Sequence, residues 1–247
     1  MTDFALLPSS LQAKCERVRG DFPPHAVALL DAGGHNSINP KHWPCEDSLA
    51  VCAVEDGLLA VVGDSHWGGA ASECAAKRLA HSWTRARAPN LQARLVRTLL
   101  MIEAAFHLDR PAKDRSETTV LIAHLTRDRI HWVNVGDSFL WVLSETLDAG
   151  AALLNERSGH FMGNFALAAS SAYTTGSRSL QAGERVLLAS DGIEPEASGL
   201  KTAEVAAFLP GRDLGAELEA LADRACDEAQ GGGRDNLALV YVDPAGI

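Results

Sequence analysis

One stretch decides how this chain folds: Val61-Val62-Gly63-Asp64-Ser65-His66-Trp67-Gly68-Gly69. An apolar run ends there in an acidic side chain, a small residue, a histidine and then two glycines. This pattern is typical of a strand that delivers a carboxylate and an imidazole to an exposed rim, because the glycines let the backbone turn tightly into the next element. We therefore expect Asp64 and His66 to lie at the end of a buried strand.

The residues before this stretch predict a β-hairpin. Asp56-Gly57 is a hairpin-turn signal, and it lies between apolar runs at residues 48–54 and 58–62. The pair Glu46-Asp47 precedes the first run, and Asp64 follows the second. Because a hairpin brings these two ends together, we expect the three acidic side chains to be neighbours.

Apolar spacing predicts the remaining elements. Pro89 breaks a helical pattern, and Asn90 and Asp213 are suited to cap two further helices. Helices are expected at residues 70–88, 90–107 and 213–230, and further strands at 25–30, 118–125, 130–135, 139–143, 185–189 and 237–242. Two consecutive helices after a hairpin predict a helical layer on a sheet. Residues 144–184, rich in Ala, Ser and Gly, give no clear prediction.

Length and charge narrow the class of protein. The chain has 247 residues, 47% of them hydrophobic, which is enough for one large domain with a core. Its formal net charge of −10 argues against a nucleic-acid backbone or an anionic membrane as the main partner. Because we find no repeat and no linker, we expect a single domain over residues 1–247, with residues 1–20 as a short helix or a loosely attached arm.

The cysteines indicate a reducing compartment. There are five of them, an odd number, and they show neither CxxC pairing nor zinc-site spacing. Scattered reduced thiols are typical of a cytoplasmic protein. The first residues lack the pattern of a signal peptide, and the longest apolar stretches are too short to cross a bilayer. We expect a cytoplasmic protein without membrane insertion.

Carboxylates recur at the ends of the predicted strands, flanked by Gly, Ser or Asn. They are Glu46, Asp47, Asp64, Asp137, Asp191 and Asp235. A single Asp beside Gly is usually a turn residue, but the same arrangement at five places makes coincidence less attractive. Acids brought together raise one another's pKa unless a cation lies among them. An oxygen-only cluster suits Mg²⁺ or Mn²⁺, and two such ions can activate a water for attack on a phosphoester.

The same motifs, in the same order, resemble the signatures of the metal-dependent protein phosphatases, the protein phosphatase 2C or PPM family. They are Cys45-Glu46-Asp47-Ser48, Asp64-Ser65-His66-Trp67-Gly68, Val133-Asn134-Val135-Gly136-Asp137-Ser138, Ala189-Ser190-Asp191-Gly192 and Gly233-Arg234-Asp235-Asn236. Glu117-Thr118-Thr119 is a weaker match to a small-residue strand entry. The resemblance covers residues 25–243 and is to a small bacterial-type member.

The resemblance implies a fold and a reaction. The fold is α+β, a four-layer α/β/β/α sandwich with two central antiparallel sheets. The reaction is the hydrolysis of phosphoserine and phosphothreonine in proteins by a metal-activated water, with no covalent enzyme intermediate, using two or three Mn²⁺ or Mg²⁺ ions. The partner would be a phosphorylated protein substrate, so that the enzyme counters a serine/threonine kinase.

The resemblance also implies a role for each site residue. Asp64 would bridge two ions, with Glu46 and Asp47 in the first acidic motif. Asp191 and Asp235 would bind the ion on the other side, and Asp137 would help to hold a third, weaker ion. His66 would be the general acid that protonates the leaving oxygen.

The chain departs from the family pattern at four places. Ser65 replaces the glycine whose carbonyl binds metal in the family, although a serine carbonyl can still serve. His42, with Lys41 beside it, stands where the family often has an arginine that clamps phosphate, and neither offers a planar fork. Phe139 stands where an arginine often follows Gly-Asp-Ser. The segment between Asp137 and Asp191 is short, so the flap near the active site is expected to be reduced.

Two alternative functions remain open, and Ser65, His42 and the short middle segment motivate the first of them. One is a catalytically weak or silent relative that binds a phosphoprotein or a kinase as a regulator; the full set of acids argues against it. The other is a phosphoesterase for small molecules. A protein that binds no metal would favour the silent regulator over an enzyme. A catalytic efficiency far higher for small phosphomonoesters than for phosphopeptides would favour the small-molecule phosphoesterase.

Overall fold

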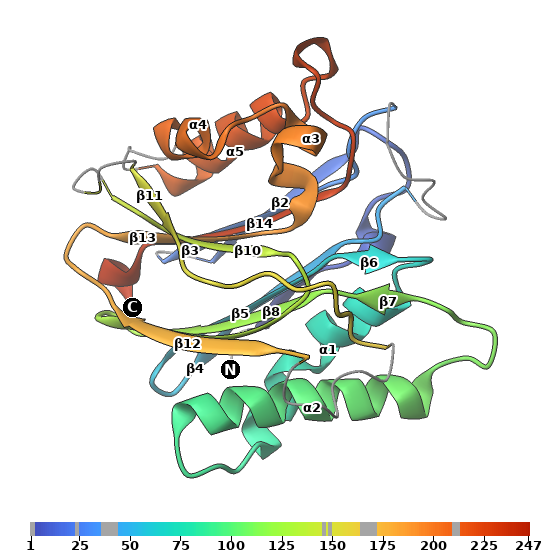
Figure 1. The fold of residues 1–247 in the computed structure, drawn as a ribbon, viewed down its shortest axis with the longest axis vertical. Coiled ribbons are helices and arrows are strands. Elements are labelled where there is room, and N and C mark those ends of the chain that lie inside the picture. Colours follow the sequence, from blue (N-terminus) through green and yellow to red (C-terminus); the bar gives the residue numbers. More distant parts are fainter. Residues whose placement is uncertain are drawn as a thin grey trace.

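The computed structural model describes residues 3–22, 25–35, 44–144, 147, 150–163, 172–208 and 213–247. Two six-stranded antiparallel sheets lie face to face, and helices cover the outer face of each sheet (Figure 1). This confirms the predicted α/β/β/α sandwich. The acid-bearing segments lie where strands of the two sheets end, so the sandwich determines which carboxylates meet.

The first sheet has the strand order β1-β4-β5-β8-β9-β12. Its strands are β1 (Asp3–Leu6), β4 (Ser48–Val54), β5 (Gly57–Gly63), β8 (Val120–Leu125), β9 (Arg129–Val135) and β12 (Thr174–Ser179). Helices α1 (Ala70–Arg85) and α2 (Leu91–Asp109) cover its outer face (Figure 1). Val61 of β5 packs there with Leu79 of α1 and Leu99 of α2, so the predicted helical stripes are core contacts.

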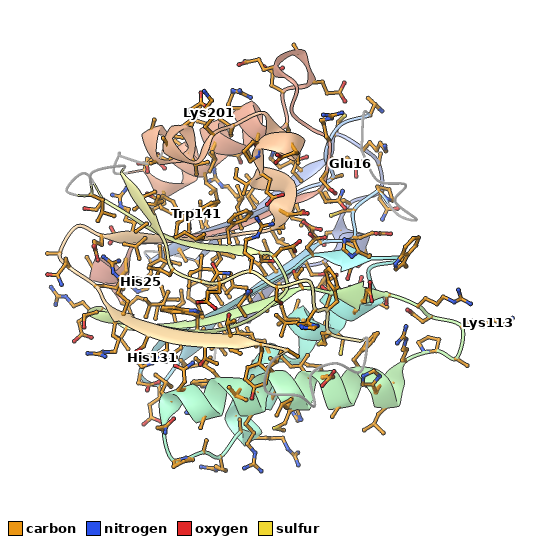
Figure 2. All side chains as sticks on the ribbon, in the orientation of Figure 1. Glu16, His25, Lys113, His131, Trp141 and Lys201 are labelled. Atoms are coloured by element: carbon orange, nitrogen blue, oxygen red, sulfur yellow. The ribbon has the colours of Figure 1, made fainter. Side chains whose placement is uncertain are left out.

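The second sheet has the order β11-β10-β13-β14-β3-β2. Its strands are β11 (Ala151–Leu153), β10 (Phe139–Leu143), β13 (Arg185–Ala189), β14 (Leu237–Val242), β3 (Ala26–Asp31) and β2 (Arg17–Phe22). Helices α3 (Pro195–Ser198), α4 (Thr202–Ala207) and α5 (Leu214–Ala225) lie outside it (Figure 1). Trp141 lies between this sheet and those helices (Figure 2), in one cluster with Leu218 of α5.

Strand β10 contributes side chains to two hydrophobic cores, one between the sheets and one under the helices. Leu140 and Val142 point between the sheets, whereas Trp141 points to the helical layer. This follows from the two-residue period of a strand. Because both faces of the sheet are covered, the central strands are apolar throughout, which is why they read as continuous apolar runs rather than as alternating patterns.

The smaller elements complete the chain. A two-stranded sheet joins β6 (Ser65–His66) to β7 (Glu117–Thr118), and the 3₁₀ turns are η1 (Pro8–Ser10), η3 (Asp191–Ile193), η4 (Glu228–Gln230) and η5 (Pro244–Gly246). The side chains of Asn90 and Asp213 accept hydrogen bonds from the backbone N–H groups of Ala93 and Ala216, which confirms both predicted caps. Within the residues the structure describes, no helix has the length and apolarity needed to cross a membrane.

The prediction of a short helix or loose arm at residues 1–20 is wrong. Strand β1 pairs with β4, and β2 pairs with β3, so both sheets gain an outer strand from this segment. In β2, Val18 and Phe22 pack against the core between the sheets, while Arg19 and Asp21 are exposed. Gly20 and the charged residues weaken the apolar alternation on which the prediction of a strand depends.

Candidate active site

Strand register brings the predicted acids of the first sheet together. Ser48 of β4 pairs with Gly63 of β5. Asp47 lies one residue before this pair and Asp64 one residue after it, so the hairpin places them as neighbours, as expected. Both residues are buried.

The register of the second sheet does the same for another pair. Phe139 of β10 pairs with Ala189 of β13. Asp137 lies two residues before Phe139, and Asp191 lies two residues after Ala189, so both acids flank the same end of this ladder. Because β9 belongs to the first sheet and β10 to the second, the turn that carries Asp137 also joins the two layers.

One acid of the first pair, Asp64, meets both acids of the second pair; among the described residues Asp47 is not part of this group. One carboxylate oxygen from each of Asp64, Asp137 and Asp191 lies within 4.8 Å of the others. All three ligand atoms are oxygens, the type that Mg²⁺ and Mn²⁺ prefer. Like charges so close together are costly unless a cation or a proton lies among them, so the residues present fit the divalent ions that the sequence implies.

The pKa of Asp191 reflects the cost of placing these like charges together. Burial raises the pKa of Asp191 well above the ordinary aspartate value, and the charge of Asp64 is the next largest cause. Asp235 and Asp137 raise this pKa further. Asp235 therefore acts on the cluster through its charge, as expected of a residue beside Asp191.

This raised pKa predicts how the stability of the metal-free protein depends on pH. The folded state holds the Asp191 proton more tightly than the unfolded state, so this stabilisation is complete below the ordinary aspartate pKa of 3.8 and is lost as pH rises through the raised value. We expect Asp191→Asn to raise the thermal midpoint at neutral pH, but not below pH 3.8, when melting is followed in excess chelator. An equal fall in the midpoint at both pH values would contradict this prediction.

Backbone and hydroxyl groups fix Asp64 in place. The backbone N–H of Asp64 donates to Oγ1 of Thr119 at 3.0 Å, and the carbonyl of Asp64 accepts from Oγ1 of Thr118 at 2.9 Å. Oγ1 of Thr119 also lies 2.8 Å from Oγ of Ser138, the residue after Asp137. Thr119 thus connects the two loops that carry cluster acids. The weaker match at Glu117-Thr118-Thr119 predicts a strand entry and does not predict this connection.

Thr119→Val tests that connection, because it removes the hydroxyl and nearly preserves the shape of the side chain. We expect a loss of about 1–3 kcal/mol in the free energy of unfolding, since Ser138 and the Asp64 N–H lose a buried partner. Thr84→Val, at an exposed position of α1, is the matched control and should change stability by less than about 0.5 kcal/mol. Equal effects in urea denaturation would show that Thr119 has no special role.

The first and last acidic motifs are joined by one buried amide. The backbone N–H of Glu46 donates to Oδ1 of Asn236 at 2.8 Å, and the Asn236 amide donates to the carbonyls of Ala32 and Pro44 at 2.9 and 3.0 Å. Asn236 itself follows Asp235 and is buried. This amide therefore places Glu46 near Asp235 although 189 positions of chain separate the motifs, a contact that the sequence does not indicate.

His66 is half-buried in the strand β6, two residues after Asp64. Its ring contacts Phe161 edge-on with a centroid distance of 4.9 Å, and its backbone lies opposite Glu117. Ser65 lies in the same strand, and its Oγ accepts from the N–H of Ser72 at 3.0 Å. The side chain of Ser65 is thus engaged in positioning α1, and the predicted metal contact through its carbonyl stays a prediction.

A cavity of about 1080 Å³ adjoins this strand. Pro8, Trp67, Glu73 and Glu117 line it, together with Lys113, which projects from the loop between α2 and β7 (Figure 2). Trp67 is 61% exposed. Its backbone has a φ of 63°, a conformation that non-glycine residues adopt rarely. The predicted phosphate-binding residues Lys41 and His42 lie outside the described residues.

Known structures share this architecture. The chain has a TM-score of 0.66 and 19% identity with the serine/threonine phosphatase PstP/Ppp of Mycobacterium tuberculosis, covering 88% of this chain and 97% of that one. For the PPM Ser-Thr phosphatase MsPP of Mycobacterium smegmatis, in complex with cacodylate, the values are 0.63 and 20%, with 88% and 97% covered. A PstP catalytic domain in complex with two manganese ions gives 0.63 and 20%, with 92% and 99% covered. At these identities the likeness shows the fold.

The sequence itself gives the family. No curated protein matches this chain as a relative. Residues 39–220, about three quarters of the chain, match the sequence model of the family described as Protein phosphatase 2C. This range includes four of the five acidic motifs quoted above, and the fifth lies beyond it, directly before β14. The chain belongs to the protein phosphatase 2C family.

Proposed function

We propose that this protein is a single-domain, metal-dependent serine/threonine protein phosphatase. The observation that carries the proposal is the meeting of Asp64, Asp137 and Asp191, whose carboxylate oxygens lie within 4.8 Å of one another. Carboxylates grouped at this distance repel one another, so their close grouping is explained most simply by divalent cations. Family membership directs the use of those cations to phosphoprotein hydrolysis.

The cluster would hold two or three Mn²⁺ or Mg²⁺ ions. Asp64 and Asp191 would be the central ligands, and Asp137 would help to hold a third, weaker ion. Asp235, Glu46, Asp47 and the carbonyl of Ser65 would be further ligands. When bound, the ions supply an activated water and neutralise the charge of the phosphoryl group. The manganese ions in the PstP structure support this choice of metal.

The protein groups around the cluster would orient the reaction. Asp64 is held by Thr118 and Thr119, so its carboxylate is presented from a fixed backbone. His66, in the adjoining strand, would donate the proton that the leaving serine or threonine oxygen requires. Lys41 and His42 are proposed to attract the phosphate, in place of a bidentate arginine.

The substrate would be a phosphorylated segment of another protein, so that the enzyme counters a serine/threonine kinase in the cytoplasm. Trp67, the residue after His66, lines the cavity described above. Residues that flank a phosphorylated side chain could lie in this cavity. Its volume of about 1080 Å³ is enough for several amino-acid side chains.

The substrate class can be tested by comparing catalytic efficiencies. With Mn²⁺ present, a phosphothreonine peptide should be hydrolysed with a higher kcat/KM, relative to its intrinsic reactivity, than p-nitrophenyl phosphate and other small phosphomonoesters. A ranking with natural small phosphomonoesters far above phosphopeptides would favour a small-molecule phosphoesterase. No turnover and no heat of Mn²⁺ binding in calorimetry would favour a silent regulator.

A further inference from the structure

Arg157 lies directly against the acid cluster. Its Nε donates to the backbone carbonyl of Asp137 at 2.7 Å, and its Nη2 lies 3.8 Å from the Asp137 carboxylate. Its guanidinium also stacks over the ring of Phe139, 4.4 Å from the centroid. A positive charge therefore accompanies one of the three carboxylates that meet in the cluster.

The segment that carries Arg157 is bound firmly along the Asp137 turn. Ser158 N–H donates to the carbonyl of Gly136 at 2.8 Å, and the Ser158 hydroxyl accepts from the Gly136 N–H at 3.1 Å. On the other side, Asn155 accepts from Leu140 N–H and donates to the carbonyl of Ser138. Residues on both sides of Arg157 are thus anchored, so the fold fixes the backbone from which the exposed Arg157 side chain reaches Asp137.

Arg157 has a second carboxylate partner, three residues after Asp191 in the chain. Its Nη1 forms an ion pair with Glu194, and the Glu194 N–H donates to the carbonyl of Asp191 at 2.7 Å. The guanidinium therefore links the turn that carries Asp137 to the 3₁₀ turn that begins with Asp191. Both partners are partly exposed, with side-chain exposures of 32% for Asp137 and 23% for Glu194. Either carboxylate can therefore exchange the guanidinium for another partner.

We propose that Arg157 is the built-in counter-ion of Asp137 and thereby sets how weakly the cluster binds the ion that Asp137 helps to hold. The inference rests on the proposed function, because it assumes that the cluster binds divalent cations. Arg157 is a positioning residue: it reaches the cation through the charge and the backbone of Asp137. A cation at Asp137 must approach a carboxylate that already carries a guanidinium, so its affinity is lowered by charge repulsion.

The two partners of Arg157 give this proposal an unusual signature. Removing the guanidinium frees the charges of Asp137 and Glu194, so the weakest ion should bind more tightly. Neutralising Glu194 removes the competing partner, leaves Arg157 to Asp137 alone and withdraws one negative charge, so that ion should bind more weakly. Two variants that break the same ion pair should therefore shift cation affinity in opposite directions. Simple loss of structure would weaken binding in both.

Isothermal titration calorimetry of the metal-free protein with Mn²⁺ tests this directly. We expect Arg157→Gln to lower the Kd of the weakest ion by about tenfold and Glu194→Gln to raise it severalfold. Arg157→Lys, which keeps the charge, should stay close to wild type. Arg129→Gln, at the far end of β9, removes the same charge from an exposed site and should leave the Kd unchanged. The Mn²⁺ concentration for half-maximal turnover should move in the same directions.

Several results would overturn the inference. Weaker or unchanged Mn²⁺ binding in Arg157→Gln, or a shift in the same direction for both variants, would show that Arg157 merely supports the loop. An equal shift in Arg129→Gln would show a general effect of net charge. Wild-type protein that binds no Mn²⁺ at all would instead overturn the proposed function, and the inference with it, so the two failures are distinguishable.

Discussion

Asp64→Asn is expected to reduce turnover of a phosphothreonine peptide by roughly a thousandfold or more, at any Mn²⁺ concentration. Asp64 is the cluster acid supplied by the first sheet, and it is 2% exposed. An asparagine keeps the size of the side chain and removes the charge that would face the cations. Because Thr118 and Thr119 bind the backbone of Asp64, the fold should survive the change.

The control for this variant is Asp109→Asn. Asp109 ends helix α2, and its side chain is 62% exposed in an ion pair with Arg78. The same chemical change there should leave turnover within about twofold of wild type, since exposed ion pairs contribute little to stability. If Asp64→Asn retained more than about a tenth of wild-type turnover in Mn²⁺, the assignment of Asp64 as a bridging ligand would be wrong.

His66→Gln is expected to separate two substrates according to their leaving groups. A serine or threonine oxygen needs a proton as it leaves, and general acid catalysis contributes roughly 10²–10⁴-fold. The nitrophenolate of p-nitrophenyl phosphate is stable without a proton. We therefore expect kcat on a phosphothreonine peptide to fall by roughly 10²-fold or more, with a much smaller effect on p-nitrophenyl phosphate.

The exposed His81 on α1 offers a matched control. His81→Gln should change neither activity. If His66→Gln reduced both substrates by the same factor, His66 would be acting on the cluster or on binding, and another group would have to supply the proton. If neither activity fell, the catalytic assignment of His66 would be contradicted outright.

The parts of this fold that local sequence predicts are those in which one residue pattern decides the outcome. The run into Asp64 becomes β5, the Asp56-Gly57 turn becomes the predicted hairpin, and Asn90 caps α2. These elements are long and strongly apolar, or have a cap with its own hydrogen bond, so tertiary packing agrees with local preference.

Other parts depend on contacts that no local pattern reveals. Strand β12 has the sequence TTGSRS, which looks like a loop, yet it pairs with β9 along its whole length. Gly176 is needed there because a Cβ would lie 2.1 Å from the ring of Trp132. A polar edge strand can rest on its neighbour through backbone hydrogen bonds, so its side chains give little signal.

The site divides in the same way. Carboxylates beside Gly, Ser or Asn at strand ends are predicted from the sequence as site residues. The strand register brings Asp64, Asp137 and Asp191 together. Arg157 gave no sequence signal, because it lies in the segment without a clear prediction and reaches Asp137 from 20 positions away. Charged side chains that act on a site through its backbone are found only once the chain is folded.

The most direct measurement of the central claim is hydrolysis of a phosphothreonine peptide by the purified protein, assayed with Mn²⁺ and with excess chelator. The account predicts turnover that requires the metal and returns when Mn²⁺ is added back. Turnover of equal rate in the chelated protein would contradict the proposal that the carboxylate cluster works through divalent cations.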